Sequence, residues 1–129
     1  MRLRAVPENV PVVRHALGGM AATRGADKRT RGAIALAVTE AVANVVVHAY
    51  TDRTDSVGLM EVHATADADE IDVVIRDEGG GLRPDSPGAG LGAGLRLIGA
   101  MAQRFDITRR DGATEVHMAF SLHPAQLAA

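Results

Sequence analysis

Three polar side chains recur at intervals of four residues in an otherwise apolar stretch of the sequence. Glu40, Asn44 and His48 lie within TEAVANVVVHAY, residues 39–50. Residues four apart lie on one face of a helix, so these side chains would form a narrow polar stripe. The carbonyl oxygen of Asn44 is a neutral ligand of the kind that Mg²⁺ accepts beside water and phosphate oxygens. Glu40, one turn away, could orient or deprotonate a nucleophile.

The stripe also has a simpler explanation, because charged residues on helices usually face solvent. Its neighbours in AVTEAVANVVV are too apolar for a freely solvated face. A buried carboxylate or amide without a partner costs about 1–3 kcal/mol. We therefore expect a polar ligand beside Glu40 and Asn44. The role of His48, which could cap or line the helix end, stays open.

A second group of polar residues follows a predicted strand in RDEGGGL. Asp77 ends the strand, and Gly79 and Gly81 come soon after it. An ordinary turn has the same pattern. In a binding site, Asp77 could accept a hydrogen bond from the exocyclic amino group of adenine, which guanine lacks at that position, and the glycines would let the backbone approach the ring. Thr114, in the last predicted strand, could contact the same base or simply pack as a β-branched strand residue.

Glycines recur in GAGLGAGLRLI and lead directly into a predicted helix. Gly92 and Gly94 precede Leu95 there. Backbone N–H groups at a helix N-terminus can bind an anion, with the positive end of the helix dipole behind them. A flexible linker is the alternative. Arg83 and Arg96 lie close enough in sequence to reach a phosphate, but exposed arginines are common and their roles stay open.

The composition argues against several other functions. The 129 residues hold 14 Lys and Arg against 16 Asp and Glu, a net charge of −2, so we expect no direct nucleic-acid partner. The absence of Cys excludes disulfides and thiolate nucleophiles, and the five His show no paired spacing for zinc. No run approaches the roughly 18 apolar residues of a membrane span, and no signal peptide is evident, so we expect no membrane association.

The remaining pattern assigns these residues to helices and strands. Apolar spacing predicts the helices, and alternation between turn signals predicts the strands. The expected helices cover residues 8–22, 28–50 and 95–104. The expected strands are 1–6, a hairpin over 59–77, and the pair 104–110 and 114–122 around the Asp111–Gly112 turn. We expect the residues after about 123 to be frayed.

Adjacent strand pairs and separate helices predict an α+β fold rather than a doubly wound parallel sheet. We expect one domain over residues 1–129, a two-layer sandwich with a mixed, mostly antiparallel sheet and helices on one face. A dinucleotide-binding fold would carry its glycine turn after the first strand. Here the glycines follow the third predicted strand, which argues against that fold.

The order of these motifs resembles a known ATP-binding domain. ExxxN on a long helix, DxGxG after a hairpin, a glycine-rich segment leading into GxGL and a Thr in the last strand occur in the same order in the Bergerat-type domain of DNA gyrase, the related heat-shock chaperone, sensor histidine kinases and MutL proteins. The resemblance covers about residues 8–122. The segments LAVTEAVANVVVHAY, IRDEGGGL, GLGAGLRLIGAMAQRFDI and GATEVHM are most similar to the stand-alone bacterial anti-sigma-factor serine kinases.

This resemblance implies a role for each candidate residue, with ATP and Mg²⁺ as the cofactors. Glu40 would be the catalytic base and Asn44 the Mg²⁺ ligand. Asp77 would read adenine. The remaining implied contacts are Gly79 and Gly81 beside the base, Gly92, Gly94 and Leu95 at the phosphates, and Thr114 as a second base contact. The sequence departs from the resembled pattern in having GAT before the last strand and a short glycine segment.

The implied activity is phosphorylation of a serine on a small antagonist protein that competes with a sigma factor, in the cytoplasm, with a homodimer as a possible assembly. Sensor histidine kinases usually carry Lys where this chain has Val47, so autophosphorylation on His is not expected. Two alternatives stay open. One is a non-catalytic ATP-binding module of the same fold that sequesters a partner, and the other is an α+β domain whose glycines are only a loop.

Overall fold

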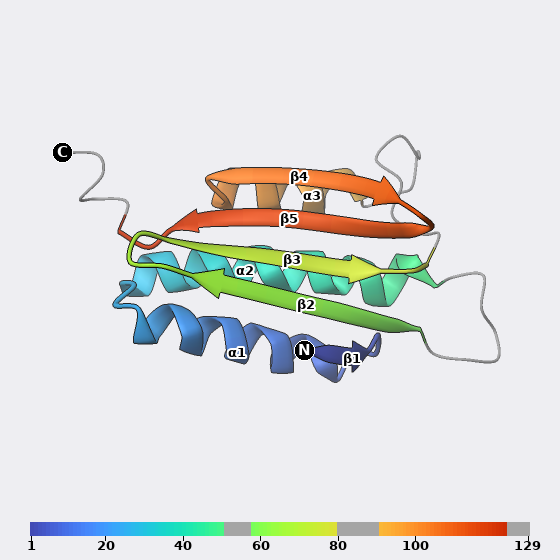
Figure 1. The fold of residues 1–129 in the computed structure, drawn as a ribbon, viewed down its shortest axis with the longest axis horizontal. Helices are drawn as coiled ribbons and strands as arrows, with labels where there is room; N and C mark the ends of the chain where they lie inside the picture. Colours follow the sequence, from blue (N-terminus) through green and yellow to red (C-terminus); the bar gives the residue numbers. More distant parts are fainter. Residues whose placement is uncertain (51–57, 80–90, 124–129) are drawn as a thin grey trace.

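The computed structural model describes residues 1–50, 58–79 and 91–123. Five strands and three α-helices, one of them extended by a π-helical turn, make up this part of the chain (Figure 1). In chain order the elements are β1 (Arg2–Arg4), α1 (Asn9–Thr23), α2 (Lys28–Asn44), η1 (Val45–Ala49), β2 (Leu59–Ala66), β3 (Glu70–Asp77), α3 (Leu91–Met101), β4 (Arg104–Arg110) and β5 (Ala113–Ser121).

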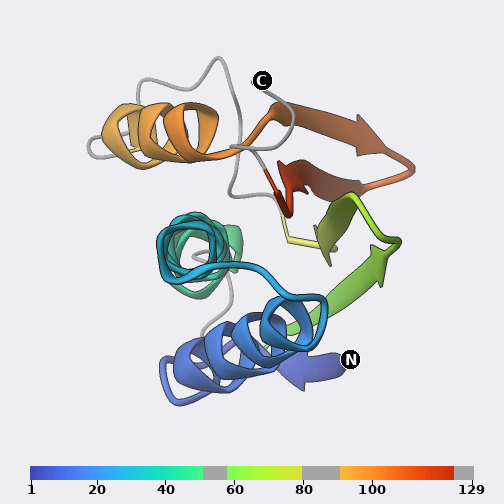
Figure 2. The same ribbon diagram turned by 90° about the vertical axis from the view of Figure 1, so that its left-hand side faces the viewer.

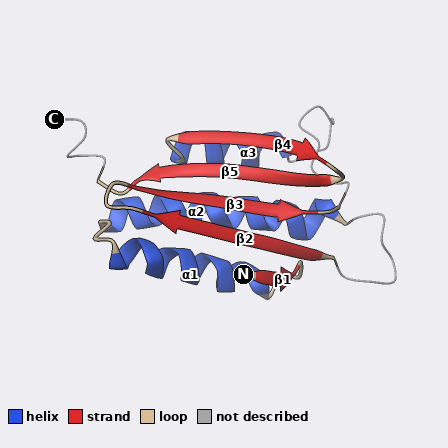
Figure 3. Cartoon of the chain, in the orientation of Figure 1, coloured by secondary structure: helices blue, strands red, loops and turns tan. Residues whose placement is uncertain are grey.

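The five strands form one sheet, with the helices on one of its faces. The strand order is β1-β2-β3-β5-β4, and every pairing between described strands is antiparallel. Viewed end-on, the sheet forms one layer and the three helices form the other, with α2 between α1 and α3 (Figure 2). Figure 3 shows the same separation of strands and helices. The expected α+β two-layer arrangement is confirmed.

The central helix α2 begins at a side-chain cap and buries one apolar stripe. Asp27 lies just before it and accepts a hydrogen bond from the backbone N–H of Thr30 at 2.8 Å, which satisfies one of the free N–H groups of the first turn. Ile34, Val38 and Val42 recur every four residues and are fully buried. This spacing places them on one helix face, so the predicted apolar face is the one that packs in the domain.

The sheet contributes the other half of the core through alternate residues. Ile71, Val73 and Ile75 of β3 are fully buried, whereas Asp72 between them is exposed. A strand with this alternation has one face on the core and the other toward solvent. Asp77 is the next residue in the buried series, so the strand itself brings this carboxylate to the helix side of the sheet.

The hairpin between β4 and β5 has the two-residue turn that the sequence predicts. Asp111 and Gly112 have φ angles of 55° and 77°, and positive φ at both central residues is typical of the turns that match the twist of a hairpin. The turn fixes the register, so that Arg110 pairs with Ala113 and Arg109 pairs with Thr114.

Two helix boundaries differ from the sequence prediction. The expected helix over 28–50 is α-helical to Asn44 and π-helical from Val45 to Ala49. The expected helix over 95–104 spans Leu91–Met101 instead, so its first turn includes Gly92 and Gly94. Glycine disfavours helix by about 1 kcal/mol relative to Ala, and packing against α2 offsets that local preference, as the site below shows.

The segment Lys28–Ala49 is 22 residues long, with a mean hydropathy of 1.6 in its most apolar window, and by these measures alone it could cross a membrane. Thr39, Glu40 and Asn44 interrupt the segment, so it is not an unbroken run of about 18 apolar residues. In the structure the segment is the central helix of the helical layer (Figure 1). A core helix passes the same test of length and composition.

Candidate functional site

Two of the predicted stripe residues lie against the first turn of α3. A β-carbon at Gly94 would lie 3.1 Å from Oε2 of Glu40, and 3.7 and 3.8 Å from Nδ2 and Oδ1 of Asn44. The missing side chain at Gly94 therefore lets the α3 backbone approach both polar groups of α2 closely. We call Glu40, Asn44 and Gly94 the helix cluster. It joins the ExxxN pattern to the glycine segment.

The amide of Asn44 has an unfilled hydrogen-bonding capacity. Its Nδ2 atom is buried and has no hydrogen-bond partner within the described residues. Oγ1 of Thr39 is likewise buried without such a partner. Buried polar groups nearly always have a partner, so an orphaned one requires an explanation. An amide kept for a ligand is one such explanation, and this atom lies within reach of Gly94, where the glycine segment begins α3.

Asp77 occupies the opposite side of the site, at the end of β3. Its side chain is 2% exposed, and Oδ1 accepts a hydrogen bond from the backbone N–H of Gly79 at 3.0 Å. A β-carbon at Gly79 would lie 1.9 Å from the carbonyl oxygen of Ala49. Only glycine fits there, because the turn after β3 packs directly on the backbone at the end of η1.

Burial changes the acid–base behaviour of Asp77. Removal of the carboxylate from water raises its pKa to about 6, because a low-polarity environment disfavours the charged form. The Gly79 N–H and the positive charges of Arg109 and Arg76 act in the opposite direction and stabilise the carboxylate. Near neutral pH the Asp77 side chain is therefore mainly an ionised hydrogen-bond acceptor, held in an apolar setting.

Thr114 pairs directly with Asp77 across the sheet, and Arg109 pairs with Thr114 in turn. Thr114 is fully buried, and its Oγ1 accepts a hydrogen bond from Nη1 of Arg109 at 2.8 Å. The same Nη1 lies 3.4 Å from the carbonyl oxygen of Gly79. We call Asp77, Gly79, Thr114 and Arg109 the sheet cluster, which unites the two predicted base contacts.

Arg109 was not among the predicted site residues. It stands beside Arg110 at a strand end, where an arginine usually faces solvent. A usable signal was nevertheless present, because a two-residue Asp-Gly hairpin pairs the second residue before the turn with the second residue after it. That count pairs Arg109 with Thr114, as the structure does.

The two clusters are joined through one helical segment. Asn44 ends α2, and Ala49, five residues further along the same helical segment, ends η1. The backbone of Ala49 packs against Gly79. The end of β3, the end of α2 and η1, and the start of α3 all lie at the same end of the domain (Figure 1). Leu95 is half-buried in α3, and Gly92 lies in the first turn of this helix. Gly81 and Arg83 lie outside the described residues.

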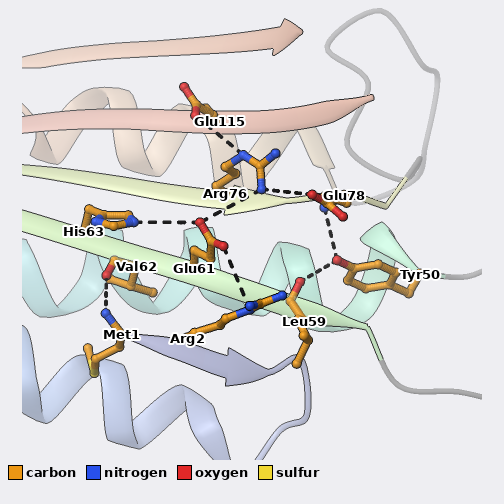
Figure 4. Close-up of polar contacts among 10 residues, drawn as sticks. All are labelled: Met1, Arg2, Tyr50, Leu59, Glu61, Val62, His63, Arg76, Glu78 and Glu115. Atoms are coloured by element: carbon orange, nitrogen blue, oxygen red, sulfur yellow. Dashed lines mark hydrogen bonds and ion pairs between the residues drawn. The ribbon is translucent and has the colours of Figure 1, made fainter. Parts of the chain in front are cut away.

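A polar network holds the turn after β3 from its other side. The Tyr50 hydroxyl donates to the carbonyl oxygen of Leu59 and accepts from the backbone N–H of Glu78 at 3.1 Å. Glu78 also forms an ion pair with Arg76 at 3.2 Å, and Arg76 forms a second ion pair with Glu61 of the neighbouring strand β2 (Figure 4). These contacts fix the backbone on which Asp77 and Gly79 depend.

A separate hollow of about 640 Å³ is lined by side chains of β3, β4 and β5, including Arg104, Asp106 and His117. Most of these residues alternate with the buried ones and therefore belong to the sheet face turned away from the helices. Its lining includes none of the four sheet-cluster residues. We therefore assign the candidate site to the two clusters and not to this hollow.

The described side chains fit a nucleotide with its magnesium ion. The sheet cluster offers a buried acceptor and a hydroxyl to a base. Beside a glycine-rich helix start, the helix cluster offers the orphaned Nδ2 of Asn44 as a donor to a phosphate oxygen, and Oδ1 of Asn44 and the Glu40 carboxylate as oxygen groups. Within the described residues no three His, Asp or Glu side chains form a metal-binding group. A metal ion beside Asn44 would thus take its other ligands from phosphate and water, which is common for Mg²⁺.

Fold and site together define an α+β nucleotide-binding domain with its polar residues between the helical layer and one end of the sheet. Comparison with known families makes this assignment specific. The family described as the histidine kinase-like ATPase domain matches residues 3–120, and the chain belongs to this family. The resemblance inferred from the motifs is confirmed.

Two proteins with similar sequences are named serine-protein kinases. The serine-protein kinase RsbW of Bacillus pumilus is 31% identical over 80 residues, which are 62% of this chain and 49% of that protein. The serine-protein kinase RsbW of Staphylococcus aureus (strain MRSA252) is 35% identical over 79 residues, 61% of this chain and 49% of that protein. The match thus spans about half the length of these relatives.

Solved structures show the same fold. The crystal structure of the RsbU and RsbW domains of a Mycobacterium tuberculosis protein matches with a TM-score of 0.68 and 22% identity, over 95% of this chain and 32% of that one. A blue-light activated histidine kinase of Erythrobacter litoralis matches with a TM-score of 0.64 and 24% identity, over 79% of this chain and 33% of that one. These matches support the two-layer fold that the motifs predicted.

Proposed function

We propose that residues 1–129 form a single ATP-dependent protein kinase domain that transfers the γ-phosphate of ATP to a serine of a small antagonist protein. The antagonist would compete with a sigma factor for this domain, so that phosphorylation decides which partner is bound. The observation that carries the proposal is the close approach of the α3 backbone at Gly94 to the side chains of Glu40 and Asn44. Similarity to serine-protein kinases of the RsbW type supports the substrate class.

The residues divide the work of binding between the two clusters. Asp77 accepts a hydrogen bond from the adenine amino group, with Thr114 as a second base contact and Gly79 and Gly81 giving the ring room. Gly92, Gly94 and Leu95 hold the phosphates at the start of α3, where free backbone N–H groups favour negative charge. The sandwich thereby fixes the nucleotide between its two layers.

Glu40 is the proposed catalytic base. A carboxylate beside the phosphates can take the proton from the serine hydroxyl while the serine oxygen bonds to the γ-phosphorus. At the same time the bond between the γ-phosphorus and the ADP oxygen breaks. Asn44 would hold the Mg²⁺, which would supply charge neutralisation at the phosphate oxygens. Phosphoryl transfer depends mainly on positioning and charge stabilisation, so this small set of residues is sufficient machinery.

Phosphotransfer with Glu40→Gln tests the proposal. The protein is incubated with Mg²⁺, γ-labelled ATP and the small antagonist protein of its own organism, and label on the antagonist serine is counted. We expect transfer to fall about 10²–10⁴-fold, with ATP affinity by calorimetry nearly unchanged. Glu8→Gln is the matched control, because Glu8 is an exposed carboxylate before α1 that makes no cap hydrogen bond there.

Each result has a distinct meaning. If the wild-type protein labels the antagonist and Glu40→Gln transfers far less label, the result supports a kinase. ATP binding without any label on the antagonist rejects catalysis and favours the alternative, a module that uses ATP to hold a partner without turnover. The proposed partners place the reaction in the cytoplasm, and size measurement with and without ATP would show whether a homodimer is the working form.

A further inference from the structure

Tyr50 joins the helical layer to the turn after β3. It directly follows η1, and its hydroxyl donates a hydrogen bond to the carbonyl oxygen of Leu59 and accepts one from the backbone N–H of Glu78 at 3.1 Å (Figure 4). A phenol hydroxyl has a single hydrogen, so its donor is used toward β2 and its acceptor toward the turn. Glu78 lies between Asp77 and Gly79, so the second bond ends within the turn that carries one side of the proposed site.

The ring of Tyr50 is fixed by close packing. A β-carbon at Gly58 would lie 2.2 Å from Cε2 and Cζ of the ring, so the ring lies directly on the backbone that enters β2. The glycine allows this approach because it has no side chain. The carbonyl oxygen of Gly58 in turn accepts a hydrogen bond from the backbone N–H of Ala5 at 2.8 Å. The hydroxyl is therefore presented from a ring held in one place.

The place of this joint in the chain connects the two clusters. Tyr50 comes six residues after Asn44, the last residue of α2, and Ala49 between them packs its carbonyl oxygen against Gly79. Elsewhere the two layers pack through the apolar core, and burial of apolar surface is non-directional. A hydrogen bond, in contrast, fixes both direction and distance. The joint at Tyr50 therefore limits how far the helix cluster can move from the sheet cluster.

We propose that Tyr50 is a positioning residue that sets the spacing between the helix cluster and the sheet cluster, so that one nucleotide can occupy both. The inference rests on the proposed ATP site. A nucleotide carries its base and its phosphates at separations that its covalent structure limits. Two half-sites held at the matching separation bind it far more tightly than either half-site binds its own part, because the second contact is made within the complex.

Each cluster also has internal contacts that do not involve Tyr50. In the sheet cluster, Asp77 accepts from the Gly79 N–H at 3.0 Å, and β3 stays paired with β5 as far as Asp77. In the helix cluster, the backbone of α3 approaches α2 at Gly94. Removal of the Tyr50 hydroxyl should therefore loosen the distance between the clusters and leave each half-site intact.

The experiment compares the wild type with Tyr50→Phe, which keeps the ring on Gly58 and removes only the hydroxyl. Calorimetry with Mg²⁺ gives the affinities for ATP and for its two parts, adenosine and inorganic triphosphate. Thr23→Val is the matched control, because Oγ1 of Thr23 also donates to a backbone carbonyl at a helix end, that of Met20 at 2.8 Å. α1 ends at the opposite end of the domain from the site (Figure 1).

We expect Tyr50→Phe to bind ATP about fivefold to tenfold more weakly than the wild type, as for the loss of one hydrogen bond. The affinities for adenosine and for triphosphate should each stay within about twofold of the wild-type values, because neither ligand spans the two clusters. The advantage of ATP over its two parts should therefore shrink. Thr23→Val should resemble the wild type with all three ligands.

A purely structural role for Tyr50 gives a different pattern. In that case Tyr50→Phe lowers the unfolding midpoint and weakens ATP, adenosine and triphosphate by the same factor, which overturns the inference while the ATP site stands. An equal loss for adenosine and ATP, with triphosphate unchanged, also overturns it, because Tyr50 would then support the base side alone. Unchanged affinity for ATP has the same meaning. Failure of the wild type to bind ATP overturns the proposed function as well.

Discussion

The sheet cluster and the helix cluster both carry polar groups into the domain, yet the ligand-free protein treats them differently. Asp77 and Thr114 each have a protein partner, the Gly79 N–H and the Arg109 guanidinium. The amide nitrogen of Asn44 is buried with none within the described residues. The base-binding side of the proposed site is therefore preformed, whereas the phosphate side is completed by what binds there.

This difference indicates why each cluster lowers the free energy of unfolding of the ligand-free protein. At the sheet cluster the cost is electrostatic, because a satisfied carboxylate is held away from water. At the helix cluster the cost is an unmade hydrogen bond. Substitutions that remove these groups should stabilise the ligand-free chain and impair ligand binding, by amounts that distinguish the two causes.

Asp77→Asn should have the largest effect. The folded-state pKa of Asp77 is about 6, above the ordinary value of 3.8 for this side chain. The folded protein thus holds this proton more tightly than the unfolded chain, and the unfolding free energy of the wild type should fall as pH rises from about 4 to about 6. Removing the charge should raise that free energy by up to about 3 kcal/mol at pH 7, while ATP affinity falls roughly tenfold to a hundredfold.

Urea denaturation at pH 4, 5, 6 and 7 measures the effect, with Asp106→Asn as the control because Asp106 is an exposed carboxylate of β4. The two proteins should approach each other in stability at pH 4, where Asp77 is protonated in the folded state and no buried charge remains. An unfolding free energy of the wild type that rose relative to that of Asp77→Asn between pH 4 and pH 6 would contradict the raised pKa.

Asn44→Leu should have an intermediate effect. Leucine has nearly the same shape and no unpaired amide, so the unfolding free energy should rise by about 1–2 kcal/mol. The binding of ATP should lose its dependence on Mg²⁺, measured by calorimetry with Mg²⁺ and with EDTA. Asn9 provides the contrast, because its Nδ2 donates to the Arg4 carbonyl at 2.8 Å, and Asn9→Leu should lower stability by about 0.5–1.5 kcal/mol. Stabilisation by Asn9→Leu, or destabilisation by Asn44→Leu, would reverse the comparison.

The sequence predicted the sheet cluster only in part, for reasons that particular residues make clear. Asp77 and Thr114 were identified because a strand-terminal acid before glycines and a late-strand Thr have a recognisable pattern. Arg109 was missed because its contact with Thr114 depends on strand register. The Asp111–Gly112 turn encodes that register, so the information was present in the sequence but not used.

The helix boundaries were harder to predict, because packing decides them. The span of α2 and η1 followed from its apolar spacing, but nothing in VVVHA distinguishes a π-turn from an α-turn. The early start of α3 at Leu91 contradicts the low helix propensity of its glycines. The reason is tertiary, since at Gly94 the absence of a side chain allows the contact with Glu40 and Asn44.

The smallest expected effect separates these two kinds of glycine within α3. A β-carbon at Gly99 would meet nothing within 4 Å, whereas one at Gly94 would lie 3.1 Å from Oε2 of Glu40. Gly99→Ala should therefore raise the unfolding free energy by up to about 1 kcal/mol and leave phosphotransfer unchanged. Gly94→Ala should raise the unfolding free energy by less, because the Glu40 side chain must move to make room. This substitution should also slow phosphotransfer, while the affinity for adenosine at the sheet cluster stays the same. Equal stabilisation by both substitutions, with equal activity, would show that the α3 contact has no part in positioning Glu40.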